Sequence, residues 1–292
     1  MVLGLAAQKT GLIVRNGIAA PFADERAATP QPCSGDRMPV LNVEGLSKSF
    51  GPRSVLERVS FTLSEHEFVA VLGPSGAGKT TLFRCITGMT AADTGRIQFE
   101  GVEIESLALR ERRKIAVVFQ EFNLVRRLTA LENVLAGRLA HVPMWRGVLR
   151  CFDRVDILKG FESLERVGLL DQALQRADTL SGGQQQRVAI ARSLAQEPRL
   201  IVADEPVASL DPSSAAGVLE LLKQIARSDG VAVICSLHQV NYARLYADRI
   251  VGLSRGRVIL DAQTGTLDDA KYHALYEAAA LPQDTTASVN AS

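Results

Sequence analysis

The sequence predicts an α/β fold: a mixed sheet flanked by helices, with antiparallel β-hairpins and an inserted all-helical subdomain. An apolar strand at 68–72 enters a glycine-rich loop, and a helix-compatible stretch at 80–89 follows that loop. Continuous apolar runs at 200–203 and 231–236 are typical of parallel strands that are covered on both faces. From residue 122 the hydrophobic pattern becomes helical, which indicates a helical subdomain at about 122–180.

The chain is predicted to have three parts. Residues 1–37 are rich in Ala, Gly, Pro and Gln and have no sustained helix or strand period, so we expect a disordered extension. The folded domain is predicted at 38–265. In the remaining part, 266–292, a short helix at 268–279 precedes a polar tail.

The strands of the domain follow in order between turn residues. Simple strands are predicted at 40–43, 54–56, 59–63 and 115–119, the last ending at Gln120. Two pairs of short runs flank a two-residue turn that ends in Gly and predict hairpins: 95–99 with 101–104, and 249–253 with 257–261.

Capping residues in the sequence indicate where two of the helices begin. Thr129 and Glu132 have the spacing of a capping box and predict a helix to about Leu139. Ser181 is a natural N-cap for a helix that runs to Gln196. Further helices are predicted at 110–113, 153–167 and 209–227. The helix at 153–167 is predicted to be amphipathic because every third residue is apolar: Val155, Leu158, Phe161, Leu164 and Val167.

Composition narrows the class of protein. A formal net charge of +1 gives no reason to expect nucleic acid as a partner. The four cysteines are scattered without a C-x-x-C pair, which argues against a zinc site or a disulfide framework; Cys85 and Cys235 are predicted to be buried. No apolar run reaches the length of a membrane helix, so we expect membrane association only through a partner.

The glycine-rich loop matches the complete phosphate-binding pattern G-x-x-x-x-G-K-[ST]. Its residues, which we call the phosphate loop, are Gly73, Pro74, Ser75, Gly76, Ala77, Gly78, Lys79 and Thr80. Glycines let successive backbone N–H groups point at phosphate oxygens, and the helix start adds its own free amides. Lys79 can reach the terminal phosphates, and the Thr80 hydroxyl can ligate Mg²⁺. The pattern therefore predicts binding of a nucleoside triphosphate.

Other polar residues follow the predicted strands. Asp204 and Glu205 end the apolar strand at 200–203, and His238 follows the strand at 231–236. Ligands of open α/β sheets bind at the carboxyl ends of strands, so Asp204 and Glu205 are candidates for metal coordination and water activation, and His238 can reach the terminal phosphate. A helix that starts at Ser181-Gly182-Gly183 offers a second set of amides to an anion.

In their order, these motifs resemble the ATP-binding-cassette (ABC) ATPases over about residues 40–261. The phosphate loop matches Walker A, Gln120 the Q-loop, and 200–204 Walker B followed by Glu205. The signature L-S-G-G-Q stands at 180–184, the D-loop is Ser209-Leu210-Asp211, and His238 matches the switch histidine.

The resemblance implies a set of roles and partners. Two copies would close head to tail, so that the signature of one copy meets the nucleotide of the other. Glu205 would be the general base and His238 its partner; Mg²⁺ would be held by Thr80, Gln120 and Asp204. The residues implied to bind ATP are Phe50, Gly73, Pro74, Ser75, Gly76, Ala77, Gly78, Lys79, Thr80 and Thr81, and Thr80 is also one of the metal ligands. The signature residues Ser181, Gly182, Gly183 and Gln184 are implied to face the opposite site, and Asp211 is the D-loop residue.

A finer resemblance is to the phosphonate-import ATPases, in the stretches 119–128, 132–139, 203–212 and 237–240. It implies an ATP-hydrolysing subunit that works at the cytoplasmic face of the inner membrane. The expected partners are two membrane-spanning permease subunits and, through them, a solute-binding protein. The alternatives are an importer of another small oxyanion or of an amino acid and, further off, a soluble cassette protein acting on nucleic acid or ribosomes.

Two positions depart from the family pattern. His66 stands where such proteins usually have Gly, and His tolerates a left-handed turn better than most residues. Phe50 stands where the aromatic residue that stacks on adenine is often Tyr. Phe keeps the stacking surface and loses only the hydroxyl.

Overall fold

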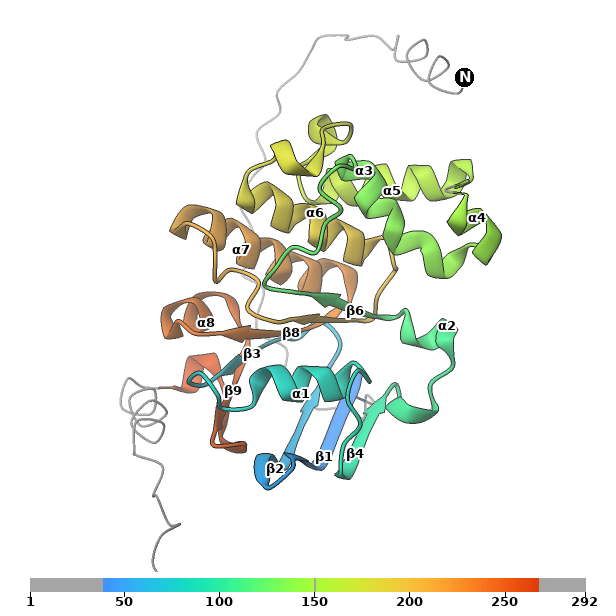
Figure 1. The fold of residues 1–292 in the computed structure, drawn as a ribbon. Coiled ribbons are helices and arrows are strands. Elements are labelled where there is room, and N and C mark those ends of the chain that lie inside the picture. Colours follow the sequence, from blue (N-terminus) through green and yellow to red (C-terminus); the bar gives the residue numbers. More distant parts are fainter. Residues whose placement is uncertain (1–38, 150, 268–292) are drawn as a thin grey trace, which may run out of the picture. The chain divides into compact units, whose positions relative to one another are not determined.

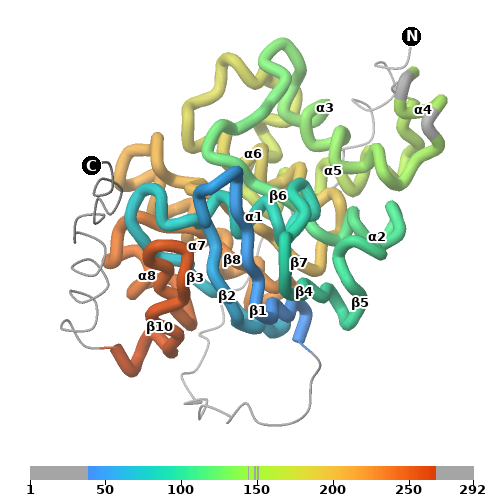
Figure 2. The backbone as a smooth tube through the Cα atoms, turned by 60° about the horizontal axis from the view of Figure 1, so that its bottom comes forward, coloured from blue at the N-terminus to red at the C-terminus, as the bar shows by residue number. Residues whose placement is uncertain are grey.

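The computed structural model describes residues 39–149 and 151–267, without the side chains of 144 and 148. The extension predicted at 1–37, and the helix and tail predicted within 268–292, lie outside the described residues. Figures 1 and 2 show the described part as two sheets with helices packed around them.

Strands that follow one another in the sequence are divided between the two sheets. The antiparallel sheet has the order β2 (Arg53–Leu63), β1 (Leu41–Phe50), β4 (Thr94–Phe99), β5 (Val102–Glu103). The larger sheet has the order β10 (Arg257–Gln263), β9 (Arg249–Ser254), β3 (Phe68–Leu72), β8 (Ala232–Leu237), β7 (Leu200–Ala203), β6 (Ile115–Val118). Its strands are parallel except for β10, which pairs antiparallel with β9. The sheet is therefore mixed, as predicted.

The strands β3, β7 and β8 of the larger sheet are buried on both faces, which explains their uninterrupted apolar sequences. In β3, Phe68, Ala70 and Leu72 join one hydrophobic cluster, whereas Val69 and Val71 join the other, as the two-residue period of a strand requires. The first cluster includes residues of α3, α5, α6, α7 and α8. The second includes α1 and the antiparallel sheet. The loop after β3 thus leaves the best-covered part of the fold.

The helices are α1 (Lys79–Ile86), α2 (Leu109–Arg112), α3 (Ala130–Leu135), α4 (Met144–Val148), α5 (Arg154–Arg166), α6 (Gly182–Leu194), α7 (Pro212–Asp229) and α8 (Val240–Tyr246). Four of them, α3 to α6, stand between β6 and β7 in the sequence and lie together in the upper half of Figure 1. The prediction of a helical insertion in the sheet domain is consistent with this arrangement.

Most predicted element starts are confirmed. Thr129 and Glu132 form a reciprocal capping box at α3, and His66 adopts the left-handed backbone with φ 60°. Both predicted hairpins form. Two predictions are wrong in detail: the strands at 54–56 and 59–63 are one strand, β2, which continues through a left-handed Arg58 with φ 50°.

Helix ends are the less accurate part of the prediction. The helix after the phosphate loop ends at Ile86 rather than near residue 89. The helix from Thr129 changes at Ala136 to a 3₁₀ segment, Ala136–His141, so the α-helical part is shorter than expected. The region before α5 contains the short helix α4, which the sequence did not indicate.

The predicted apolar stripe of α5 is only partly correct. Leu164 and Val167 are buried, but Val155 is 60% exposed and Leu158 50% exposed. A spacing of three falls short of the 3.6-residue turn, so a row of such residues rotates around the helix instead of staying on one face. The N-terminal half of α5 buries the polar Asp156 and Gly160 in their place.

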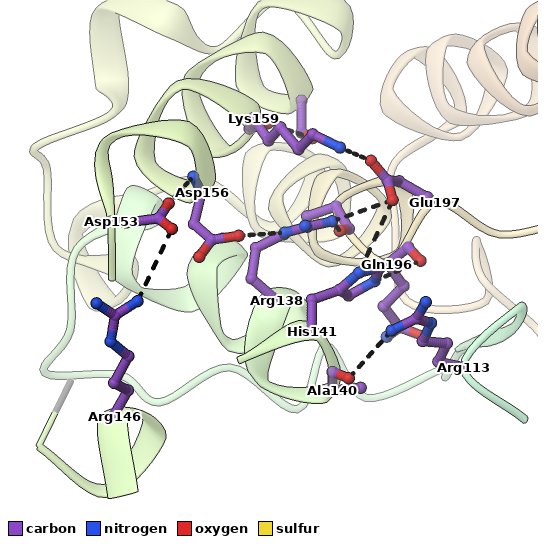
Figure 3. A network of polar contacts seen from close by, with 12 residues as sticks. Arg113, Arg138, Ala140, His141, Arg146, Asp153, Asp156, Lys159, Gln196 and Glu197 are labelled. Carbon is purple, nitrogen blue, oxygen red and sulfur yellow. Dashed lines mark hydrogen bonds and ion pairs between the residues drawn. The ribbon is translucent and has the colours of Figure 1, made fainter. Parts of the chain in front are cut away.

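A charge cluster explains why a carboxylate is buried there. Arg138 Nε donates to Asp156 Oδ1 over 2.9 Å, and both side chains are almost fully buried. Arg138 Nη1 donates to the carbonyl of Ala195 over 2.8 Å, and Glu197 accepts from Lys159 and lies 3.5 Å from Arg138. Figure 3 shows Arg138 and Lys159 pointing toward Glu197, with Asp156 on the other side of Arg138. We call Arg138, Asp156, Lys159 and Glu197 the charge cluster; it joins α5 and the 3₁₀ segment to the end of α6.

Helix α6 also buries Gln186 completely, and neither its Oε1 nor its Nε2 has a hydrogen-bond partner among the described residues. A buried polar group left unpaired costs about 1–3 kcal/mol. Gln186→Met, which keeps the length of the side chain and removes the amide, is therefore expected to raise the free energy of unfolding by about 1–3 kcal/mol. Urea denaturation measures the change.

The neighbouring residue supplies the control for that experiment. Gln185 Nε2 donates to the carbonyl of Leu180 over 2.9 Å, so Gln185→Met removes a made hydrogen bond and is expected to be neutral or destabilising. A loss of stability in Gln186→Met as large as in Gln185→Met would contradict the account of an unpaired amide.

Candidate functional site

The carboxyl ends of the parallel strands bring the predicted site residues to one edge of the larger sheet. Leu72 pairs with Leu237, Ala203 with Cys235, and Val118 with Ala203. The phosphate loop follows β3, Asp204 and Glu205 follow β7, His238 follows β8, and Gln120 follows β6 after one residue. The topology thus gathers residues that are up to 165 positions apart in the sequence, from Gly73 to His238.

The phosphate loop is held by close backbone packing against the β9–β10 turn. A Cβ at Gly73 would lie 2.2 Å from the carbonyl oxygen of Leu253, and one at Gly78, whose φ is 106°, would lie 2.9 Å from that of Val55. Gly256 N donates to the carbonyl of Ala77 over 3.0 Å. Glycine is therefore required at Gly73 by space, and at Gly78 by space as well as by its left-handed backbone.

Lys79 is the buried cation of the loop. Its Nζ donates to the carbonyls of Gly73, over 2.7 Å, and Pro74, over 3.2 Å. Burial lowers the pKa of Lys79, and the charges of Glu205 and Asp204 oppose that shift. A lysine held in this way presents its charge at a fixed place in the loop.

A cleft of about 440 Å³ lies over the phosphate loop. It is lined by Phe50, Arg53, Val55, Ser75, Gly76, Ala77, Gly78, Lys79, Thr80, Thr81 and Glu205. The Phe50 ring is 52% exposed, and Lys48 Nζ lies 5.4 Å from its centroid. The predicted adenine-stacking residue and the predicted base thus line the same cleft as the loop.

Asp204 and Glu205 are fixed by one serine. Ser236 Oγ donates to Asp204 Oδ1 over 2.8 Å and accepts from the backbone N–H of Glu205 over 2.7 Å. Glu205 has a left-handed backbone, with φ 51°, a costly conformation for this residue type that is common at functional sites. His238 Nε2 lies 2.6 Å from Glu205 Oε1, so the predicted pair is in direct contact.

The predicted metal ligands are brought together only in part. Thr80 and Asp204 line one small cavity with Phe83, Thr87 and Phe119. Gln120 has no side-chain hydrogen bond to either of them in the described part of the chain. A hydroxyl and a carboxylate are hard oxygen donors of the kind that Mg²⁺ prefers, and Mg²⁺ keeps several waters besides a few protein ligands. The donor set fits Mg²⁺.

The signature and D-loop residues do not line the cleft. Ser181 and Gln184 form a reciprocal capping box at the start of α6, which is exposed at Ser181 and Gly182. A Cβ at Gly183 would lie 2.8 Å from Ser214 Oγ. Asp211 is the N-cap of α7, and hydrogen bonds from Ser214 and Ser213 hold the pKa of its carboxyl well below the usual range. These residues form a separate surface around two helix starts.

Two site residues were not predicted from the sequence. Ser236, the last polar residue of an apolar strand before His238, links Asp204 to Glu205. The sequence signal that could have identified Ser236 is a single hydroxyl residue in an otherwise apolar strand. Arg53, at the turn after Phe50, lines the cleft.

Two further sequence predictions can be compared with the structure. Cys85 and Cys235 are buried, as predicted. Among the described helices, none has the length and apolar character of a membrane span.

Comparison with known proteins agrees with this geometry. The family model described as ABC transporter matches residues 56–208. The chain is 51% identical over 241 residues to the hypophosphite import ATP-binding protein HtxD of Stutzerimonas stutzeri, covering 81% of this chain and 71% of that protein. It is 50% identical over 235 residues to the phosphonates import ATP-binding protein PhnC of Frankia casuarinae. That alignment covers 79% of this chain and 93% of that protein.

Solved structures give the same result. A nucleotide-free ATP-binding cassette from an ABC transporter aligns with a TM-score of 0.72 at 28% identity, covering 82% of this chain and 99% of that one. A dimeric cassette in a post-hydrolysis state, bound to ADP and phosphate, aligns with a TM-score of 0.66 at 33% identity. The alignment covers 77% of this chain and 98% of that one. The chain belongs to the ABC transporter family, as an ATP-hydrolysing subunit.

Proposed function

We propose that this chain is the ATPase subunit that energises import of phosphonates. The contact between Glu205 and His238, beside a complete phosphate loop, supports hydrolysis of ATP in the cleft. Relatives named for phosphonate import, at 43–50% identity over about four-fifths of the chain, support the substrate class. The domain responsible is proposed to be 38–265, with its helical subdomain at about 122–180.

The cleft is proposed to hold the nucleotide at both of the nucleotide's ends, the adenine and the phosphates. The adenine stacks on Phe50, whose ring is half exposed at the mouth of the cleft. The backbone amides of 73–80 and the buried Lys79 hold the phosphates, and Thr81 lines the cleft beside them. Mg²⁺, for which Thr80, Asp204 and Gln120 are the proposed ligands, would neutralise phosphate charge when bound.

Glu205 is the proposed general base. Its carboxylate lies in the cleft, where it can accept a proton from the attacking water, and the Ser236 hydroxyl fixes its backbone. His238, in contact with Glu205 Oε1, orients that carboxylate and can reach the terminal phosphate. Because the reaction depends on positioning and charge, small displacements at this edge of the sheet control the rate.

The separate surface at the starts of α6 and α7 is proposed to complete the site of a second copy. Ser181, Gly182, Gly183 and Gln184 present helix amides to the phosphate bound by that copy, and Asp211 lies beside them across the Gly183–Ser214 contact. The alignment with a dimeric cassette supports this arrangement. The further partners are two permease subunits and a solute-binding protein, at the cytoplasmic face of the inner membrane.

A second candidate substrate is hypophosphite. The relative named for hypophosphite import is 51% identical to this chain, so the identity to that protein matches the identity to the phosphonate proteins. Both substrates are small phosphorus oxyanions, and the ATPase itself does not discriminate between them in the cleft. Only transport can separate the two.

Growth on a single phosphorus source tests the substrate. A host strain without this gene is expected to lose growth on methylphosphonate and to keep growth on phosphate. Complementation with the wild-type gene restores growth, and complementation with a Glu205→Gln gene does not. Loss of growth on hypophosphite alone would select the second candidate, and normal growth on both would reject the proposed substrate class.

A further inference from the structure

Arg53 stands at a junction of two cavities beside the phosphate loop. It begins β2 and pairs with Phe50 across the tight turn between β1 and β2. It lines the nucleotide cleft and also a neighbouring cavity of about 290 Å³ between that turn, the phosphate loop and the β9–β10 turn. Ser75, Gly76 and Ala77 also line both cavities, so Arg53 shares each of them with the phosphate loop.

The side chain of Arg53 has no hydrogen bond or ion pair to another residue of the described ranges. Other cations near it are engaged: Lys48 Nζ lies 2.6 Å from Asp93 Oδ1, and Arg257 pairs with Glu57. An arginine that is free to move in the mouth of a binding cleft keeps its charge for a ligand, because guanidinium stays protonated at all ordinary pH values.

The charges of the cleft leave room for such a cation. Besides Arg53, the charged side chains that line the cleft are Lys79 and Glu205, and Asp204 is the residue before Glu205 in the chain. Lys79 and Glu205 balance each other, and Asp204 adds one negative charge, so these three side chains together carry a net negative charge before Arg53 is counted. A polyphosphate is itself an anion, so an added positive charge at the cleft strengthens its binding.

We propose that Arg53 binds the polyphosphate of the nucleotide from outside the phosphate loop. The inference rests on the proposed function, that the cleft binds ATP. The planar guanidinium matches pairs of phosphate oxygens, which suits this role better than a point charge. One turn then contributes to both ends of the ligand: Phe50 contacts the base and Arg53 the phosphates.

Isothermal titration of the full chain with ATP, ADP and AMP, each with Mg²⁺, tests this inference. Arg53→Gln is expected to raise the Kd for ATP and ADP roughly three- to tenfold. This loss of affinity lies between the loss expected for an exposed ion pair and the loss expected for a hydrogen bond to a charged group. The Kd for AMP, which has no polyphosphate, is expected to change less than about twofold. Arg53→Lys recovers part of the loss, and the Kd of the wild type rises more steeply with KCl than that of Arg53→Gln.

Arg58→Gln is the matched control. Arg58 is an exposed arginine of the same strand that lines neither cavity, so its loss is expected to leave all three Kd values unchanged. An unchanged ATP Kd in Arg53→Gln, or an equal loss for AMP, would overturn the role in polyphosphate binding. A wild-type chain that binds no ATP would instead reject the proposed function. Thermal melting of each variant shows that the changes are not losses of folding.

Discussion

Glu205→Gln is expected to lower ATP hydrolysis by about 10²–10⁴-fold, the range typical of lost general-base catalysis. Glutamine keeps the shape of the side chain but cannot take a proton from water near neutral pH. The substitution also removes a negative charge from the cleft, which reduces repulsion of the triphosphate. We therefore expect the variant to accumulate as an ATP-bound dimer, measured by phosphate release and by size-exclusion chromatography with ATP and Mg²⁺.

Lys79→Ala separates binding from chemistry in the same assays. The substitution removes the buried cation that donates to Gly73 and Pro74, so it is expected to weaken nucleotide binding and to yield no trapped dimer.

Near-normal turnover by the Glu205→Gln variant would show that Glu205 is not the general base. His238, which contacts it over 2.6 Å, would then be the next candidate.

Asp156→Ala is expected to reduce the free energy of unfolding by about 3–5 kcal/mol, the usual cost of removing one member of a buried ion pair. Asp156 and Arg138 are both almost fully buried, so the substitution leaves the guanidinium with only the Ala195 carbonyl and the more distant Glu197. Replacing both members, as Arg138→Met with Asp156→Leu, is expected to be near neutral. Denaturant unfolding measures all three chains.

Arg146→Ala supplies the exposed counterpart of that experiment. Arg146 lies 3.9 Å from Asp153, and both side chains are substantially exposed, so its loss is expected to cost less than about 1 kcal/mol. A loss below 1 kcal/mol in Asp156→Ala as well would show that the buried pair does not hold the subdomain together.

The strand and helix that flank the proposed nucleotide site were predictable because they are set by local sequence. The phosphate loop needs a strand before it and a helix after it, and both are visible in short windows of the chain. His66 shows how far this extends: the expected left-handed turn is present, and the ring lies 3.0 Å from the carbonyl of Arg227, where it fills the space beside Gly230.

Contacts between distant segments were not predictable in the same way. Asp156 was missed as a buried residue because its partner, Arg138, lies on another element, and a charged residue on a predicted amphipathic helix is ordinarily placed in water. Ser236 was missed for a similar reason, since its two partners, Asp204 and Glu205, follow the neighbouring strand β7. Period and propensity describe one element at a time and do not report such pairs.

In mechanical terms, α6 is a rod with one exposed end and one anchored end. Its 13 residues span about 20 Å, from the exposed Ser181 to the charge cluster, where Arg138 holds the Ala195 carbonyl. A tilt of roughly 5° about the anchored end displaces the Ser181 end by about 2 Å. Hydrogen bonds are lost over shorter distances than that. In the proposed dimer, the charge cluster at one end of α6 would therefore set how accurately the other end is placed against the second copy.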